Sequence, residues 1–480
     1  MNIINKYKSL SKEVKASVSY TICNILTKCL SLLTLPIFTR MMTTEEYGLV
    51  TVYTSTAAVV VIFTSLQLPY GSLSTAMIKF KDDREGYLSS LCSITAILTI
   101  GYMILCYVFQ NTMEQYLDLP IGLIILMGIE MLFTTSRVAW MGYQRFEYRY
   151  RNVVIITLLT SMMSVLASLV AVIIFRQKGV AKICANAIVV CVIGFLIFFF
   201  LIKKGKRPFE KKYWKFAFTF NIPLIPYYLS QVIFNQSDRL MINKICGRSD
   251  AAMYGVAYSI ATILVFVVSS IHSSYTPWIF ERIEKKELQE NRKISLILSS
   301  GIAFMLLGII ALAPEVVRIM AGDQYTDAIW VIPPVTMSVL LLYYSDLFDC
   351  FLFFYEAKFF LAIAAVASAG VNIILNYFFI PKYGFVAAGY TTLISYAFLA
   401  WIDYLYMLKI CKKHDIDKKV YSIKGLIGVF GIFSAVGFLV MSLYRLPIVR
   451  YSIILGVFLI LYIFRKKIMK NLNLLKDDLQ

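Results

Sequence analysis

The chain has 480 residues, of which 59% are hydrophobic and 15% aromatic, and its formal net charge is +19. Its mean hydropathy is +0.72, because apolar runs of about 20 residues, each long enough to cross a bilayer, recur along its whole length. This composition excludes an ordinary soluble domain. It also argues against nucleic acid as a partner, since the positive charge of a membrane protein gathers in its cytoplasmic loops.

Fourteen apolar runs are predicted to be transmembrane helices, because only a helix satisfies the backbone in a run that lacks the alternation of a barrel strand. We therefore predict an all-α integral membrane protein. The predicted spans cover residues 16–39, 47–69, 86–109, 119–140, 153–175, 179–202, 216–243, 252–275, 294–320, 328–353, 359–380, 385–408, 423–443 and 447–464.

The distribution of basic residues predicts the orientation of these spans. If the N-terminus is cytoplasmic, 34 of the 47 Lys and Arg residues fall in cytoplasmic segments and nine in outer loops, when residues at the edges of spans are counted with the adjoining segment. Basic residues accumulate on the cytoplasmic side of membrane proteins. Both termini are therefore expected in the cytoplasm.

Several motifs recur at a nearly constant offset, which indicates an internal duplication. The Tyr-Gly pair at 47–48 returns at 254–255, Gly101 matches Gly308, and Gly179 matches Gly384. Parallel repeats are related by an axis along the membrane normal, so we expect two six-helix lobes around a central cavity. The predicted divisions are an N-terminal lobe at 1–212, a C-terminal lobe at 213–412, and two additional helices with a cytoplasmic tail at 413–480.

Two predicted spans carry polar stripes at helical spacing. The first span has Tyr20, Asn24, Thr27, Ser31 and Thr34, with Lys28 beside them, and the seventh has Asn221, Leu224, Tyr228, Gln231, Asn235 and Asp238. Such faces turn toward water or toward protein partners. A shared wet cavity is one interpretation, and hydrogen bonds between helices of one lobe are the other.

The charged residues within the spans also allow two interpretations. Lys28 would bind an anionic group or pair with Glu130 of the fourth span. Arg318 would face the wet cavity or reach for the membrane surface. Asp346 and Asp349 of the tenth span would relay protons or bind sodium, or they would be charges at the membrane edge.

The stretch at 371–389 has two asparagines one turn apart, Asn372 and Asn376, which share a helix face. Pro381 is expected to stop this helix and Gly384 to permit a tight reversal. The small residues that follow would let the next helix pack closely.

This stretch resembles the hairpin signature of the Wzx-type polysaccharide flippases, which form the polysaccharide transport family of the multidrug/oligosaccharidyl-lipid/polysaccharide exporter superfamily. Other motifs of the chain resemble that family in the same order: Arg40-(x)6-Tyr47-Gly48, Asn221-Ile222-Pro223-Leu224-Ile225-Pro226, Asp238-Arg239, Met253-Tyr254-Gly255-Val256-Ala257-Tyr258 and Gly322-Asp323-Gln324-Tyr325-Thr326-Asp327-Ala328. The resemblance implies flipping of undecaprenyl-diphosphate-linked oligosaccharide repeat units, for O-antigen or capsule, across the bacterial inner or plasma membrane by alternating access.

A flippase of this kind needs cations for the diphosphate and polar walls for the sugars. We expect the headgroup to meet Lys28, Arg40, Arg239 and Arg318, and the path to be lined or braced by Asn24, Gln231, Asn235, Asn372 and Asn376. Asp346 and Asp349 are the candidates for coupling to H+ or Na+. No cofactor, metal site or catalytic residue is expected. The expected partners are the lipid-linked oligosaccharide, membrane lipids and the polysaccharide polymerase machinery.

Two other classes of function stay open. A related exporter would carry a cell-wall lipid precursor, a teichoic acid chain or a drug. Cationic drugs favour carboxylates in the path, whereas diphosphates favour Lys and Arg. A membrane polymerase or glycosyltransferase would be expected to have a large outer loop with acidic, Arg or His residues, and the predicted outer loops are short.

Overall fold

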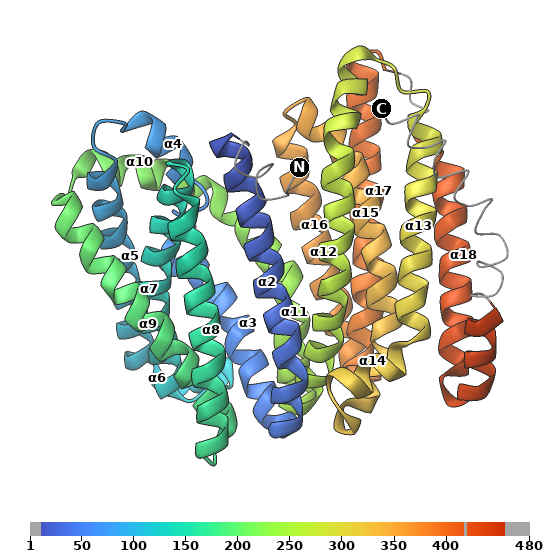
Figure 1. Ribbon diagram of the computed structural model, residues 1–480, viewed down its shortest axis with the longest axis horizontal. Coiled ribbons are helices and arrows are strands. Elements are labelled where there is room, and N and C mark those ends of the chain that lie inside the picture. Colours follow the sequence, from blue (N-terminus) through green and yellow to red (C-terminus); the bar gives the residue numbers. More distant parts are fainter. Residues whose placement is uncertain (1–10, 417–419, 457–480) are drawn as a thin grey trace, which may run out of the picture. The chain divides into compact units, whose positions relative to one another are not determined.

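The computed structural model describes residues 11–416 and 420–456, and the regular structure within them is helical (Figure 1). Twelve of the described helices are long and apolar enough to cross a membrane. The predicted all-α membrane class is therefore confirmed, whereas the predicted count of fourteen spans is not.

Two predicted spans account for the difference in number. Residues 216–243 are divided among α10 (Lys211–Asn221), the 3-10 turn η1 (Ile222–Leu224) and α11 (Ile225–Cys246), with proline near the start of both η1 and α11. The polar side chains of α11 leave it outside the apolar set. The span predicted at 447–464 coincides with a short apolar helix at Pro447–Gly456, and its remainder lies outside the described residues.

Proline interrupts fewer helices than the sequence suggested. The region predicted as a span at 252–275 followed by a loop is one helix, α12 (Arg248–Lys285), with Pro277 inside it. Pro381 also lies inside α16 (Lys358–Tyr383), so the prediction that it stops this helix is wrong. A proline in the last turns removes one backbone hydrogen bond there, and Gly384, at a φ of 69°, makes the reversal.

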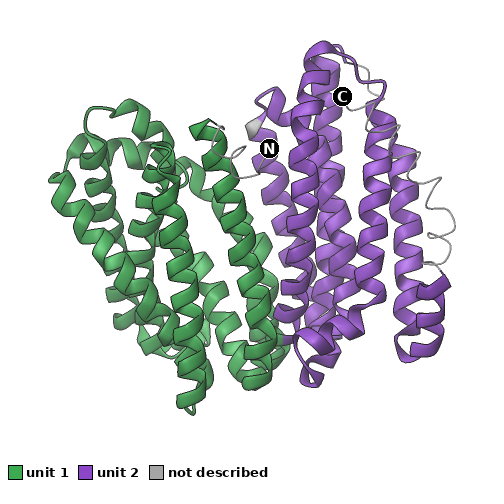
Figure 2. Ribbon diagram, in the orientation of Figure 1, with its two compact units in different colours: residues 1–252 green, residues 253–480 purple. Residues whose placement is uncertain are grey.

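The chain forms two compact units, residues 1–252 and 253–480 (Figure 2). The division into lobes at 212 and 412 stays a prediction. The first unit contains α2 (Lys12–Met41), α3 (Thr44–Ser65), α4 (Leu73–Lys79), α5 (Arg84–Val108), α6 (Gln110–Leu117), α7 (Ile121–Phe146), α8 (Tyr150–Ile174), α9 (Lys178–Gly205), α10, η1, α11 and the start of α12. The second contains the rest of α12, then α13 (Asn291–Ala311), α14 (Ala313–Met320), η2 (Asp323–Trp330), α15 (Ile332–Phe354), α16, α17 (Val386–Lys413), α18 (Ile423–Ser442) and η3 (Leu443–Arg445).

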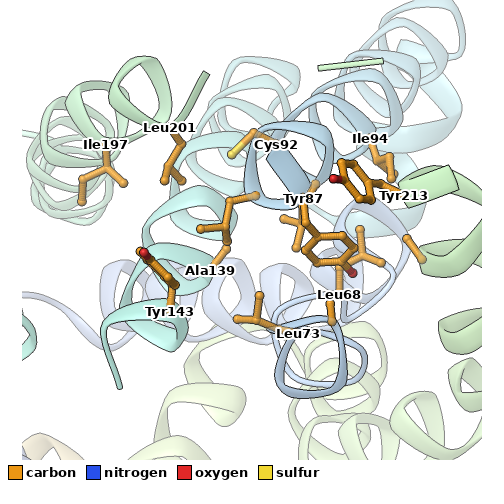
Figure 3. Packing of buried hydrophobic residues seen from close by; sticks show 14 of the residues in the cluster. Leu68, Leu73, Tyr87, Cys92, Ile94, Ala139, Tyr143, Ile197, Leu201 and Tyr213 are labelled. Atoms are coloured by element: carbon orange, nitrogen blue, oxygen red, sulfur yellow. The ribbon is translucent and has the colours of Figure 1, made fainter. Parts of the chain in front are cut away.

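The core of the first unit lies where α5, α7 and α9 pack against one another (Figure 3). Ala139 of α7, Cys92 of α5 and Leu201 of α9 are among its buried residues. Lipid is as apolar as these side chains, so close packing rather than the exclusion of water holds the helices together. Tyr87 places its hydroxyl within this core, 2.9 Å from Ser72 Oγ.

In the second unit α15 is the most enclosed helix, and it packs against α13, α17 and α18. Buried tyrosines tie these helices through backbone carbonyls. Tyr344 on α15 donates to Leu426 O of α18 at 3.0 Å, and Tyr421 donates to Leu347 O of α15 at 2.7 Å. Each buried tyrosine hydroxyl donates to a backbone carbonyl of another element, so these contacts fix the helices in register.

The Tyr-Gly motif at 47–48 opens α3 at a close helix crossing. Thr43 and Glu46 form a capping box, in which the Glu46 N–H donates to Thr43 Oγ1 at 3.2 Å and the Thr43 N–H to Glu46 Oε2 at 3.0 Å. The next turn brings Gly48 against the start of α12. A Cβ at this position would lie 2.1 Å from Arg248 O. The motif is therefore required by close backbone packing.

We expect Gly48→Ala to destabilise the protein by about 1–3 kcal/mol, as overpacked core substitutions do, because the atom it meets is backbone and cannot rotate away. Thermal unfolding of the purified protein in detergent measures this effect. Gly101→Ala is the matched control, since nothing lies within 4 Å of a Cβ there. Equal melting temperatures for the two variants would contradict the close approach.

Candidate functional site

The polar stripe of the first predicted span lies on α2, where the hydroxyls of Thr27 and Ser31 bond to the backbone of their own helix. Thr27 Oγ1 donates to Cys23 O at 3.1 Å and to Asn24 O at 2.9 Å, and Ser31 Oγ donates to Thr27 O at 3.0 Å. For these two side chains the alternative of bonds between helices is therefore wrong. Asn24 and Lys28, one turn apart on the same face, are exposed near the middle of α2.

The alternative partner for Lys28, Glu130, is occupied elsewhere. Glu130 on α7 accepts from Tyr53 Oη of α3 at 2.8 Å and from Asn186 Nδ2 of α9 at 3.3 Å. The ion pair between Lys28 and Glu130 is not formed in the described part of the chain. An exposed ammonium group within an apolar helix requires water or an anion beside it.

The seventh predicted span shows how a break in the helix changes the stripe. Asn221 ends α10 and is fully buried, where its Nδ2 donates to Ser72 Oγ and to Ala217 O, both at 2.8 Å. It is therefore an anchor within the first unit. Gln231 and Asn235 lie beyond the break on α11, where Gln231 is exposed and Asn235 is half-buried and donates to Gln231 O at 2.7 Å.

The remaining predicted cations occupy different surroundings. Arg40 is exposed at the end of α2, and half-buried Arg239 on α11 donates from Nη1 to Gln236 Oε1 at 2.7 Å. Both belong to the first unit, together with Lys28. Arg318 belongs to the second unit, where it lies on α14 and its Nε is 3.6 Å from Asp323 Oδ1. The side chains of this last pair are 79% and 85% exposed, so it contributes little to stability.

The first unit also contains two intramembrane cations to which the sequence analysis gave no role. Lys182 on α9 lies over the rings of Phe38 and Tyr47, with its Nζ 3.9 and 5.1 Å from their centroids. Arg137 on α7 is half-buried, and its Nε has no hydrogen-bond partner. Arg137 follows Glu130 by two helical turns on one face, and a charge at that spacing within an apolar run was the signal available in the sequence.

In the second unit the predicted carboxylates are joined by a third. Asp346 and Asp349 lie on α15 and Asp403 lies on α17, and the three carboxyl groups are close enough to interact electrostatically. Asp403 Oδ2 accepts from Ser345 Oγ at 2.5 Å. Asp349 Oδ1 and Asp403 Oδ1 are buried and have no hydrogen-bond partner among the described residues. A cation or a proton would relieve the repulsion among these groups.

Other polar groups extend the acidic cluster, which we define as Asp346, Asp349 and Asp403. The His272 ring on α12 is 3.1 Å from Asp346 O, an ordinary polar contact. A small pocket lies between α12, α15 and α17, and Ser338 and Leu342 line its α15 wall. Ser338, Leu342, Asp346 and Asp349 follow the spacing of one helix face, so this face runs from the pocket to the cluster.

Asn372 and Asn376 brace α16 against α17. Both are fully buried. Asn376 Nδ2 donates to Asn372 Oδ1 at 3.1 Å, and Asn376 Oδ1 accepts from Thr391 Oγ1 of α17. Of the two roles expected for these amides, lining and bracing, the described contacts fit bracing.

We expect Asn376→Ala to destabilise the protein by about 1–3 kcal/mol, because it removes the buried hydrogen bonds that Asn376 makes with Asn372 Oδ1 and Thr391 Oγ1. Thermal unfolding in detergent measures this loss. The control is Asn24→Ala on exposed α2, which should leave the melting temperature unchanged. If Asn376→Ala unfolds like the wild type but transports poorly, the amide lines the path instead.

Comparison with known proteins gives a family and a fold. A family model described as "Polysaccharide biosynthesis protein" matches residues 14–283. An uncharacterised membrane protein of Methanocaldococcus jannaschii is 22% identical over 67% of this chain and 66% of its own length, so the match spans just under two thirds of that relative. The Lsg locus putative protein 1 of Haemophilus influenzae is 22% identical over 65% of this chain and 78% of its own.

Two solved structures share the fold. An inward-facing multidrug resistance MATE family transporter of the MOP superfamily has a TM-score of 0.65 at 12% identity, covering 84% of this chain and 99% of that one. The lipid II flippase MurJ, in an inward closed conformation, has a TM-score of 0.65 at 14% identity, covering 95% of this chain and 100% of that one. This fold and the twelve apolar helices of the described chain agree with the predicted multi-pass membrane protein.

Proposed function

The chain belongs to the polysaccharide biosynthesis protein family, and we propose that it flips undecaprenyl-diphosphate-linked oligosaccharide repeat units across the membrane for O-antigen or capsule. Lys28 carries this proposal. Lys28 is exposed near the middle of an apolar helix, and the counter-ion that the sequence offered for it, Glu130, is bonded to Tyr53 and Asn186. An anionic group that passes along α2 would supply the missing charge.

The cargo's chemistry suits the residues near Lys28. A diphosphate accepts charge-assisted hydrogen bonds from Lys and Arg, and Arg40, Arg239 and Arg137 of the same unit offer further cations. Sugar hydroxyls need neutral donors and acceptors, which Asn24, Gln231 and Asn235 present. The polyprenyl tail needs no protein site, since it is already soluble in the bilayer. The fold, shared with a lipid II flippase and a drug exporter, supports alternating access.

The second unit would supply the driving force. Carboxylates within membrane spans commonly mark proton or sodium pathways. The acidic cluster combines such groups with a pocket on the same face of α15, so an ion that enters the pocket meets Asp346 before Asp349. We propose that H+ or Na+ bound at the cluster drives the transport cycle.

The decisive test is the sidedness of the lipid-linked oligosaccharide in cells that lack this protein. We expect accumulation on the inner leaflet, relieved by the wild type but not by Lys28→Ala. Loss of one charge-assisted contact weakens headgroup binding by roughly 1.5–3 kcal/mol. Lys28→Arg should restore flipping, because it keeps the charge.

Lys12→Ala is the matched control, since Lys12 is also exposed on α2 but lies at its first residue. Relief by Lys28→Ala at normal protein level would remove Lys28 from the headgroup path. Absence of accumulation in the deletion strain would reject this cargo and favour an exporter of another substrate.

A second variant tests the coupling role. We expect Asp349→Asn to fold normally but to lose the dependence of transport on the proton or sodium gradient, because an amide neither releases a proton nor carries charge. Transport by proteoliposomes with imposed gradients measures this dependence. Asp415→Asn, an exposed position after the end of α17, is the control. Unchanged gradient dependence in Asp349→Asn would exclude this carboxyl from coupling.

A further inference from the structure

Helix α10 (Lys211–Asn221) is amphipathic and too short to cross a bilayer. Tyr213, Ala217 and Asn221 recur every four residues and are buried against the first unit. Lys211, Lys212 and Lys215 are exposed. The helix therefore has one face fixed to protein and one face available to its surroundings.

The buried face is held by specific contacts. Asp83, which caps α5 by accepting from the Gly86 N–H at 3.1 Å, also accepts from the Tyr213 hydroxyl. Burial and the neighbouring carboxylate raise the pKa of Tyr213 to about 12, so this hydroxyl stays a neutral donor at physiological pH. The Tyr213 ring packs edge-on against Phe80, with centroids 4.8 Å apart. These contacts fix which side chains point outward.

The outward face retains its positive charge. Lys204 in the last turn of α9 is paired with Glu85 at 2.5 Å, and Arg207 between α9 and α10 is paired with Asp83 at 2.9 Å. Neither Lys211 nor Lys215 has such a pair among the described residues. The acidic side chain nearest in sequence is that of half-buried Glu210.

Aromatic side chains accompany these lysines. Phe209 is 72% exposed. Trp214 is half-buried, contacts the Phe209 ring at 5.9 Å between centroids, and donates its indole N–H to Pro208 O at 3.2 Å. Lysines beside exposed aromatic rings are typical of helices that lie in the headgroup layer of a membrane.

The position of α10 in the chain places it at that layer. It follows the end of α9 at Gly205, and Tyr213 and Arg207 contact Asp83 at the start of α5. Both α5 and α9 are candidate membrane spans, so the start of α5 and the end of α9 lie at one membrane surface. Figure 1 draws α10 beside α4, at the end of α5 where this helix begins.

We infer that the face formed by Phe209, Lys211, Lys212 and Lys215, which we call the α10 platform, binds the headgroups of anionic phospholipids in the leaflet at which α9 ends. The lysines supply charge, Phe209 enters the acyl boundary, and the Asp83 contacts hold the helix in place. Each lysine near an anionic membrane surface contributes about 1 kcal/mol to the free energy of binding, which corresponds to roughly a fivefold preference for anionic over neutral lipid. This inference does not depend on the transported cargo.

The test uses the full-length protein in nanodiscs of phosphatidylcholine with a minority of phosphatidylglycerol. Mass spectrometry of the lipids retained after mild detergent extraction gives the enrichment of phosphatidylglycerol. We expect Lys211→Gln with Lys215→Gln to lower this enrichment roughly 25-fold, the product of two such preferences. Raising the salt concentration from about 0.1 to about 1 M should lower the enrichment for the wild type, because it shortens the screening length.

The matched control is Arg176→Gln with Lys382→Gln, which removes the same charge from two exposed positions near the ends of α8 and α16. It should retain the wild-type enrichment. Equal losses in both double variants would show a general effect of net charge and overturn the platform. An unchanged enrichment in the α10 variant would also overturn it, and would point instead to an acidic protein, which the nanodiscs lack.

Discussion

A charged or amide side chain within the hydrocarbon of a bilayer must face protein or water, and this constraint governs the polar contacts of both units. The hydroxyls of Thr27 and Ser31 on α2 are satisfied within the helix, since they donate to carbonyls of α2 itself. Glu130 is satisfied by hydrogen bonds from two other helices. Lys28 makes neither kind of bond within the described part of the chain, and its exposure is therefore informative about function.

The two units differ in the prevailing sign of the intramembrane charges described above. In the first, Lys28, Arg137 and Lys182 outnumber Glu130, and the second contains the acidic cluster of Asp346, Asp349 and Asp403. Such a separation suits a transporter that handles an anionic headgroup and a coupling cation, because each ion finds counter-charges in a different half of the chain. An internal duplication therefore need not have preserved one chemistry in both halves.

Close packing sets the other limits of the fold. Small residues recur where helices meet without water, and Gly48 faces a backbone carbonyl that leaves no space for a Cβ. Buried tyrosines then join helices through carbonyls, as Tyr344 and Tyr421 do around α15. Each such bond is made where an unsatisfied group would be costly, so packing and polar pairing reinforce each other.

The sequence by itself determined the membrane class, most of the helices and the shared helix face of Asn372 and Asn376, because hydropathy and a four-residue spacing are local properties of the chain. It did not determine where helices end near proline, as Pro277 and Pro381 within helices demonstrate. Only the tertiary structure decided the partners: Asn221 bonds to Ser72, Glu130 to Tyr53 and Asn186, and Asp403 joins Asp346 and Asp349. These contacts join residues from 54 to 149 positions apart, and such pairings depend on which helix faces meet, which no local pattern specifies.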